Sequence, residues 1–247
     1  MLNQQTIDKL KQMKLGVFAD EMIMQTEDKS IQDLPFEERI GLLVDSEFSR
    51  RKNNKIKNLL KRATLDIPNA CIEDIEYHLD RKLDKSQIEK LSTCNYIREK
   101  QNIILLGATG AGKSYLACAF GNKACRSEFK VKYYRLPDLL VEIELSRVQG
   151  IYKDFINSLL KFDLLILDEW MLLPLNEIES RNLFELIEKR QRKGAIIFCS
   201  QFALSEWHHK IDQDTLAEAI IDRISHSSHE ILIEGKDSMR KKKRKIE

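Results

Sequence analysis

The sequence of 247 residues predicts an α/β fold in which a five-stranded parallel sheet lies between helices, preceded by a small all-helical region. Short apolar runs alternate with helical patterns after residue 101, which is typical of a parallel sheet covered on both faces. A glycine-rich turn joins the first apolar run to a helical segment. The first 66 residues instead repeat their apolar side chains at helical spacing.

The N-terminal region is predicted to hold two short helices and a long one. Residues 4–13 and 17–28 have helical periodicity, and a proline followed by two acids after Leu34 marks the start of the third helix. Its apolar residues recur at every fourth position, which predicts one long amphipathic helix, or two with a joint near Asn53. These residues are Phe36, Ile40, Val44 and Phe48.

The remaining elements follow from turn signals and apolar runs. Strands are predicted at residues 103–106, 131–134, 164–167, 196–199 and 230–233. Helices are predicted at residues 84–96, 113–126, 137–147, 151–161, 177–192 and 214–225. We therefore expect a helical N-terminal domain over 1–66, a linker and lead-in helix over 67–100, a sheet domain over 101–234 and a basic tail over 235–247.

Composition favours a cytoplasmic protein with no membrane contact. Hydrophobic residues make up 43% of the chain and charged residues 32%, and no apolar run is long enough to span a bilayer or serve as a signal-peptide centre. Five cysteines without paired spacing indicate buried free thiols. No carboxylate or cysteine completes a metal ligand set with His208 and His209, so we expect these and Trp207 at the helix surface or a subunit contact.

The glycine-rich turn carries the pattern G-x-x-x-x-G-K-[ST]. Its glycines let backbone N–H groups face phosphate oxygens, and the next helix adds the positive end of its dipole. We expect Lys113 to reach the β- and γ-phosphates and Ser114 to offer its hydroxyl to Mg²⁺, whereas the alternative is a turn that carries a lysine by chance. The predicted nucleotide-binding residues are Gly107, Ala108, Thr109, Gly110, Ala111, Gly112, Lys113, Ser114 and Tyr115.

Two carboxylates, Asp168 and Glu169, follow the third apolar strand. Ligands of open α/β sheets bind at the carboxyl ends of the strands. We expect Asp168 to hold Mg²⁺ together with Ser114, and Glu169 to orient or deprotonate an attacking water. These roles predict Mg²⁺-dependent hydrolysis of a nucleoside triphosphate. The alternative is an acidic strand end that contacts solvent only.

Gln201 and Arg223 are further candidates. Gln201 follows the fourth strand and would face the γ-phosphate if that strand lies beside the strand of Asp168. Arg223 could stabilise transition-state charge at another subunit's γ-phosphate. The residues alone leave two alternatives open. Gln201 is then simply a polar residue at the end of a strand, and Arg223 forms a surface ion pair with Asp222.

Two basic regions indicate contact with nucleic acid. The segment between Ser49 and Leu65 holds seven basic residues and no acid, with Phe48 on the side of the helix that we expect to pack on the domain. A solvated helix face is the alternative. From Arg240 onward we expect a disordered arm that contacts DNA irrespective of sequence. The predicted DNA-binding residues are Arg50, Arg51, Lys52, Lys55, Lys57, Lys61 and Arg62.

With these motifs the chain resembles the IstB-like ATP-binding proteins, AAA+ helpers of insertion-sequence transposition that are related to DnaC-type helicase loaders. The resemblance runs from about Leu10 to Lys241. It rests on the segments Leu34–Ile40, Glu47–Asn53, Gly107–Ser114, Leu164–Glu169, Ser200–Gln201, Ile221–Ile224 and Glu234–Lys241.

The resemblance implies an AAA+ P-loop NTPase in which Gly107–Ser114 is Walker A and Asp168 with Glu169 is Walker B. Gln201 stands at the first sensor, Arg223 at the arginine finger, and Arg240 near a second sensor. We expect no C-terminal lid domain, because only thirteen residues, 235–247, follow the sheet domain. The implied cofactors are ATP and Mg²⁺. The implied partners are double-stranded DNA, a cognate transposase and further copies of the chain, which assemble with ATP and separate on hydrolysis.

Two other functions fit the same motifs. A DnaC-like replicative helicase loader shares the ATPase, but the basic helix favours DNA over a helicase, and the first cysteine is Cys71, which disfavours an N-terminal zinc domain. A nucleotide-gated DNA-binding module with little hydrolysis would not need Glu169.

Overall fold

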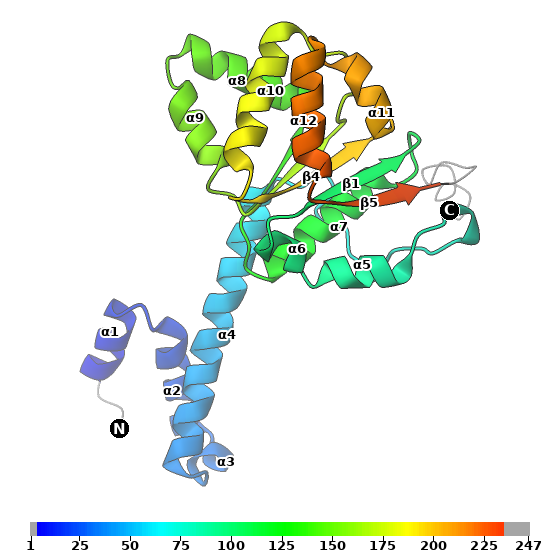
Figure 1. The fold of residues 1–247 in the computed structure, drawn as a ribbon. Helices are drawn as coiled ribbons and strands as arrows, with labels where there is room; N and C mark the ends of the chain where they lie inside the picture. Colours follow the sequence, from blue (N-terminus) through cyan, green and yellow to red (C-terminus); the bar gives the residue numbers. More distant parts are fainter. Residues whose placement is uncertain (1–3, 235–247) are drawn as a thin grey trace. The chain divides into compact units, whose positions relative to one another are not determined.

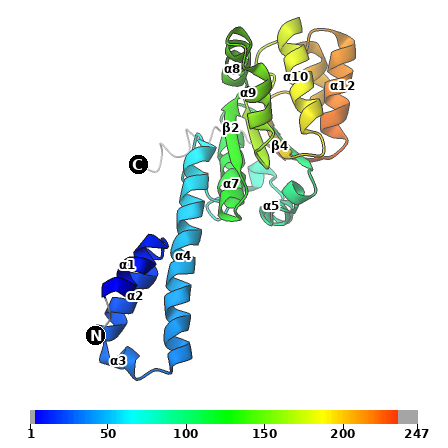
Figure 2. The same cartoon turned by 90° about the vertical axis from the view of Figure 1, so that its left-hand side faces the viewer.

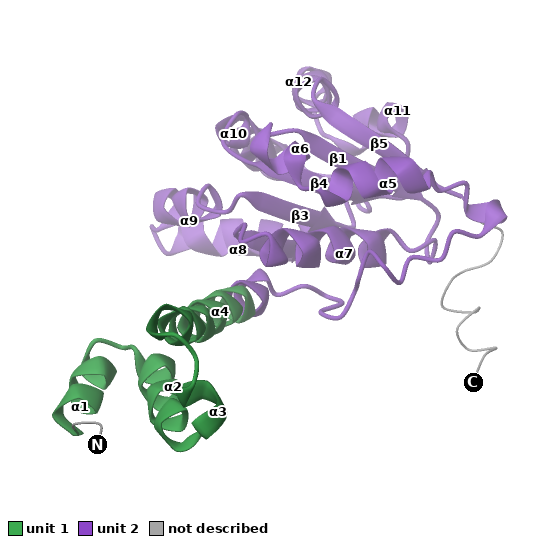
Figure 3. Ribbon diagram, turned by 90° about the horizontal axis from the view of Figure 1, so that it is seen from below, with its two compact units in different colours: residues 1–58 green, residues 59–247 purple. Residues whose placement is uncertain are grey.

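The structure, a computed structural model, describes residues 4–234. The chain forms two compact units, Met1–Asn58 and Leu59–Glu247, shown in green and purple in Figure 3. Their boundary falls inside one long helix. Among residues 4–234 no helix is long and apolar enough to cross a membrane.

The first unit is helical, as predicted. It contains α1 (Gln4–Gln12), α2 (Gly16–Glu27), α3 (Lys29–Gln32) and most of α4 (Phe36–Ala63). Of the two alternatives for the long segment, the continuous helix is correct, since α4 passes Asn53 without a break. The short α3 was not predicted.

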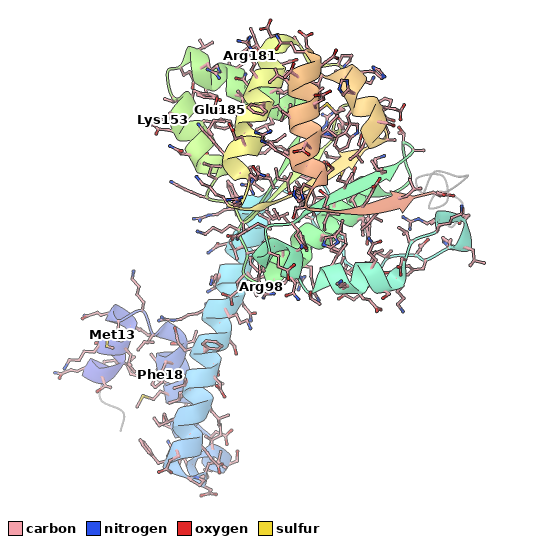
Figure 4. All side chains as sticks on the ribbon, in the orientation of Figure 1. Met13, Phe18, Arg98, Lys153, Arg181 and Glu185 are labelled. Carbon is pink, nitrogen blue, oxygen red and sulfur yellow. The ribbon has the colours of Figure 1, made fainter. Side chains whose placement is uncertain are left out.

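The packed face of α4 in this unit differs from the predicted apolar stripe. Phe36, Val44 and Phe48 are exposed, with 64% of Phe48 accessible, whereas Leu43 and Glu47 are buried. Glu47 accepts hydrogen bonds from the backbone N–H of Phe18, on α2, and from Arg51. Phe18 is labelled in Figure 4. The prediction that Phe48 packs on the domain is therefore wrong, because two hydrogen bonds to Glu47 turn a neighbouring face of the helix inward.

The second unit is built on the five-stranded parallel sheet that the apolar runs predict. Its strands are β1 (Asn102–Gly107), β2 (Val131–Arg135), β3 (Leu164–Asp168), β4 (Ala195–Ser200) and β5 (Ser228–Ile233). They are ordered β2-β3-β4-β1-β5, and every neighbouring pair is parallel. The carboxyl ends of β3, β4 and β1 therefore lie next to one another.

Helices cover both faces of this sheet (Figures 1 and 2). One face packs against α5 (Lys85–Ser92), α6 (Asn95–Arg98) and α7 (Lys113–Arg126). The other packs against α8 (Leu136–Val148), α9 (Tyr152–Leu159), α10 (Glu177–Arg190) and α12 (Asp214–Ser225). The layers alternate because successive residues of a strand point to opposite faces: Ile103 and Leu105 enter the first core, Ile104 and Leu106 the second.

The remaining differences from prediction are local. The helix expected over residues 84–96 is two helices, because Cys94 has a left-handed backbone with φ of 62°. Helix α11 (Leu204–Trp207) and the 3₁₀ turns η1 (Leu79–Arg81) and η2 (His208–Lys210) were not predicted. Trp207 is fully buried and donates to the carbonyl of Phe202, so its expected surface position is wrong.

Candidate functional site

The glycine-rich loop connects the end of β1 to the start of α7, as its pattern predicts. A Cβ on Gly107 would collide with the backbone carbonyl of Ile233 at the end of β5, so only glycine fits there. Gly112 has φ of 103°, a conformation that favours glycine, and α7 begins at the next residue. These two glycines let the loop turn directly into the N-terminus of α7, and the N-terminus of a helix is the end at which anions bind.

The Lys113 side chain folds back over this loop. Its Nζ donates to the carbonyl oxygens of Gly107 at 2.6 Å and Ala108 at 3.0 Å. Burial lowers the pKa of Lys113, while the nearby Cys199 and Asp168 act in the opposite direction. The ammonium is thus held at the loop by neutral carbonyls, which it can exchange for more strongly attracting phosphate oxygens.

Asp168 ends β3 and is fixed from two sides. Its side chain is 5% exposed. Oδ2 accepts from the hydroxyl of Tyr133 at 2.8 Å, and Oδ1 accepts from the backbone N–H of Glu169 at 2.8 Å. The nearby carboxylate also helps to raise the pKa of Tyr133, although burial of the phenol is the larger cause. Asp168 therefore presents a carboxylate of fixed orientation at the carboxyl edge of the sheet.

Glu169 lies just outside this edge in a left-handed backbone conformation, with φ of 56°. Both of its carboxylate oxygens accept from Nη2 of Arg135, at 3.0 and 2.8 Å. The pair raises the pKa of Arg135, since its cationic form is stabilised. Arg135 is the last residue of β2, and its contact with Glu169 was not predicted: no motif marks it.

Gln201 lies beside the glycine-rich loop Gly107–Ser114, which we call the phosphate loop. Because β4 lies between β3 and β1, the residue after β4 stands between the two carboxylates and the loop. Its Oε1 accepts from the hydroxyl of Thr109 at 2.7 Å. The expectation that the strand of Gln201 lies beside that of Asp168 is confirmed.

A cavity of about 460 Å³ adjoins the loop. One side comes from the loop and α7, including Lys113, Ser114 and Tyr115. The other side comes from residues before β1, among them Ile67, Ile75, Glu76, Arg81 and Leu83. These residues lie in the segment 67–100, which the sequence predicts as a linker and lead-in helix. No periodic pattern distinguishes a loop that lines a cavity from one that does not.

Arg223 lies elsewhere in the chain. It sits on α12, donates to the carbonyl of Ala219 and lies over the ring of Phe184 at 4.7 Å. It lines a separate cavity of about 300 Å³ together with Asn102 and Gly194, which stand at the amino ends of β1 and β4. The structure therefore does not bring Arg223 to the phosphate loop of its own chain, which lies at the opposite edge of the sheet.

The predicted DNA-binding residues all lie on α4 and are exposed, and Arg51 among them also holds part of the first unit together. Arg51 pairs with Glu47 at 2.7 Å and donates to the carbonyl of Lys14 at 2.7 Å, which ties α4 to the turn before α2. Arg240 and the basic tail lie outside the described residues. Within residues 4–234, no three His, Cys, Asp or Glu side chains are grouped to hold a metal ion.

Solved structures support the fold. An AMPPCP-bound DnaA from Aquifex aeolicus has a TM-score of 0.61 at 22% identity, over 74% of this chain and 56% of that chain. A DnaC helicase loader has a TM-score of 0.54 at 18% identity, over 67% of this chain and 97% of that one. At these identities the likeness concerns the AAA+ P-loop fold alone.

Sequence comparison identifies the family. A protein of Sinorhizobium fredii, named as an insertion sequence ATP-binding protein, is 37% identical over 245 residues, which are 99% of this chain and the whole of that protein. The family model described as IstB-like ATP binding protein matches residues 8–246. The chain thus belongs to the family of IstB-like ATP-binding proteins.

Proposed function

We propose that the protein is a Mg-dependent ATPase that oligomerises on duplex DNA and assists a cognate transposase in target selection or strand transfer, with ATP hydrolysis as the assembly switch. The observation that carries this proposal is the convergence of Lys113, Asp168, Glu169 and Gln201 on one sheet edge, in a family whose relatives are named for insertion sequences. A cytoplasmic location accords with it.

The residues present fit ATP and Mg²⁺. The left-handed glycines and the start of α7 form a cradle for phosphates, and the adjoining cavity of about 460 Å³ has room for the rest of a nucleotide. Mg²⁺ is usually held by one or two protein ligands together with phosphate oxygens and waters. Ser114 and Asp168 would supply the protein ligands, and the bound metal would neutralise charge on the transferred phosphoryl group.

Three residues of the chain would each have a separate role in hydrolysis. Lys113 would exchange the carbonyls of Gly107 and Ala108 for phosphate oxygens. Gln201, placed by Thr109, would orient the water. Glu169 would accept a proton from that water, and for this its carboxylate has to leave Arg135.

Assembly would place Arg223 of one subunit at the nucleotide of its neighbour. Its position at the opposite edge of the sheet from its own loop supports a role between subunits. The exposed basic residues of α4 would bind DNA phosphates. Nucleotide hydrolysis would then break both the subunit contact and the hold on DNA.

The test is assembly on DNA, measured by mass photometry and electron microscopy. With duplex DNA, Mg²⁺ and a non-hydrolysable ATP analogue, the wild type should form oligomers on the DNA, and Lys113→Ala should not. A wild type that stays monomeric under these conditions would contradict the proposal that ATP controls assembly. Retention of a co-expressed transposase on the assembled protein tests the partner.

A helicase loader remains the second candidate, because the fold is also that of a DnaC loader. The two functions differ in the partner that the protein retains. Parallel pull-downs with the transposase and with the replicative helicase, both in the presence of ATP, separate them. Retention of the helicase alone would reverse the assignment.

A further inference from the structure

Arg81 is a buried cation beside the phosphate loop. It is the last residue of η1, and 6% of it is exposed. Nη1 donates to the carbonyl of Glu76 at 2.8 Å, and Nη2 donates to the carbonyl of Ala111 at 3.0 Å. The guanidinium therefore connects the segment before β1 with the loop that carries Lys113.

The backbone of Arg81 is held from the other side. Its carbonyl accepts from the N–H of Glu234 at 3.1 Å, just after β5. The next residue, Lys82, has φ of 48°, and its Nζ lies 2.9 Å from the Glu234 carboxylate. These two contacts with Glu234 hold the turn in place, so the Arg81 side chain stays directed toward the carbonyl of Ala111.

Part of the guanidinium lacks a partner. Nε of Arg81 is buried and has no hydrogen-bond partner in the part of the chain that the structure describes. The hydrogen bonds shown for this guanidinium go to two neutral backbone carbonyls, those of Glu76 and Ala111. Burial lowers the pKa of Arg81, because its charge is poorly solvated, while the acids Glu76 and Asp80 act in the opposite direction. A buried charge that is only partly hydrogen-bonded is costly, and an anionic ligand would offset that cost.

Arg81 and Lys113 line the same cavity, one from each side of it. Two acids, Asp74 and Glu76, also line this cavity, but neither pairs with Arg81, and the Glu76 carboxylate lies 2.8 Å from Nε2 of His78. An anionic ligand that enters beside Lys113 would give both cations a counter-charge. The anion that the loop itself selects is a polyphosphate.

We propose that Arg81 is a second cationic contact for the polyphosphate of a bound nucleotide, and that it positions the phosphate loop through the carbonyl of Ala111. This inference rests on nucleotide binding as proposed above. It assigns a binding role to a residue before β1, outside both Walker motifs.

The test compares two variants that both lose the double contact with Glu76 and Ala111 but differ in charge. Arg81→Gln removes the cation, and Arg81→Lys retains it. Each is loaded with a fluorescent ATP analogue, which is then displaced with inorganic tripolyphosphate or with adenosine. The melting temperature of the unliganded protein is recorded for each, because a purely structural role would change it equally in both.

We expect Arg81→Gln to weaken displacement by tripolyphosphate about ten-fold, as for removal of a charged hydrogen bond, and to leave adenosine within about two-fold of wild type. Arg81→Lys should stay within about three-fold for both. Arg190→Gln is the control for burial, since Arg190 is 1% exposed and also donates to backbone carbonyls, but lines the other cavity. It should lower the melting temperature and leave displacement by tripolyphosphate unchanged.

Equal displacement from Arg81→Gln and Arg81→Lys, or an equal loss for tripolyphosphate and adenosine, would overturn the role of Arg81 while nucleotide binding stands. A wild type that does not bind the ATP analogue would overturn the proposed function as well. The two failures are therefore distinguishable.

Discussion

Glu169 is held in two ways that a solvent-facing acid would not need: a left-handed backbone and a two-oxygen contact with Arg135. If it is the general base, Glu169→Gln should reduce ATP turnover about a hundred-fold or more while ATP still binds. Phosphate release measures the turnover, and binding of a fluorescent ATP analogue measures the affinity. Unchanged turnover would show that Glu169 is not the general base and would favour a nucleotide-gated DNA-binding module with little hydrolysis.

Arg135 gives a second prediction, of opposite sign. Because Glu169 has to leave Arg135 before it can accept a proton, Arg135→Ala should raise basal turnover. The pair is partly exposed, with 49% of the Arg135 side chain and 31% of the Glu169 side chain accessible, so its contribution is at most about 1 kcal/mol and the gain about five-fold. Arg135→Lys, which keeps a charge, should lie between. A fall in turnover for Arg135→Ala would show that Arg135 positions Glu169 for catalysis.

How far single residues could be predicted depends on whether a motif contains them. Lys113, Asp168 and Gln201 follow strands or fill a spaced pattern, and the structure places them near one another. Arg81 and Arg135 carry no pattern, because each meets the site through one tertiary contact: Arg81 to the Ala111 carbonyl and Arg135 to Glu169. Contacts of this kind depend on loop geometry, which periodicity does not encode.

At the scale of elements, the sheet was the easiest to predict. All five predicted strands are present. The fully apolar runs of β1, β3 and β4, such as Leu164–Leu167, are typical of strands buried on both faces. The face of α4 was harder to predict. Its apolar stripe from Phe36 to Phe48 is regular, yet Glu47 is buried through its contact with Phe18. The bonds of one polar side chain outweighed the hydrophobic pattern there.

Helix α4 also carries the prediction for DNA. Arg50 and Lys57 lie on one exposed face of the helix, so replacing both with Ala should weaken duplex binding and make its dependence on salt less steep. The slope of log affinity against log salt should fall by roughly 0.9 for each DNA phosphate that the helix no longer neutralises. The measurement is fluorescence anisotropy with labelled duplex DNA over a series of salt concentrations.

Two variants serve as controls for this experiment. Lys153→Ala with Lys161→Ala removes the same charge from exposed positions of the second unit (Lys153 is labelled in Figure 4), and should leave the slope unchanged. Arg51→Ala should lower the melting temperature, because Arg51 holds Glu47 and the carbonyl of Lys14. If both double variants changed the slope equally, binding would reflect overall charge and not the face of α4.

At the scale of the whole molecule, the two ends of the sheet suggest how copies of the chain would cooperate. The loop and Glu169 lie at the carboxyl edge, whereas Arg223 lines a cavity at the amino edge. One chain therefore offers a nucleotide site on one side and an arginine on the other. Such an arrangement is complete only when a second copy supplies the arginine, so a subunit should not hydrolyse ATP efficiently alone.

Mixing two inactive variants tests this dependence. Arg223→Ala and Glu169→Gln should each turn over ATP slowly on DNA. The first lacks the arginine that a neighbour supplies, and the second lacks the general base of its own site. In a mixture, the intact Glu169 of an Arg223→Ala subunit can meet the intact Arg223 of a Glu169→Gln subunit. About a quarter of the subunit contacts in a random equal mixture should then be active, so the ATP turnover of the mixture should exceed that of either variant alone. Arg223 also lies 3.6 Å from Glu188, a partly exposed pair that costs little to break. A mixture no more active than its components, with assembly on DNA intact, would place the role of Arg223 within its own subunit.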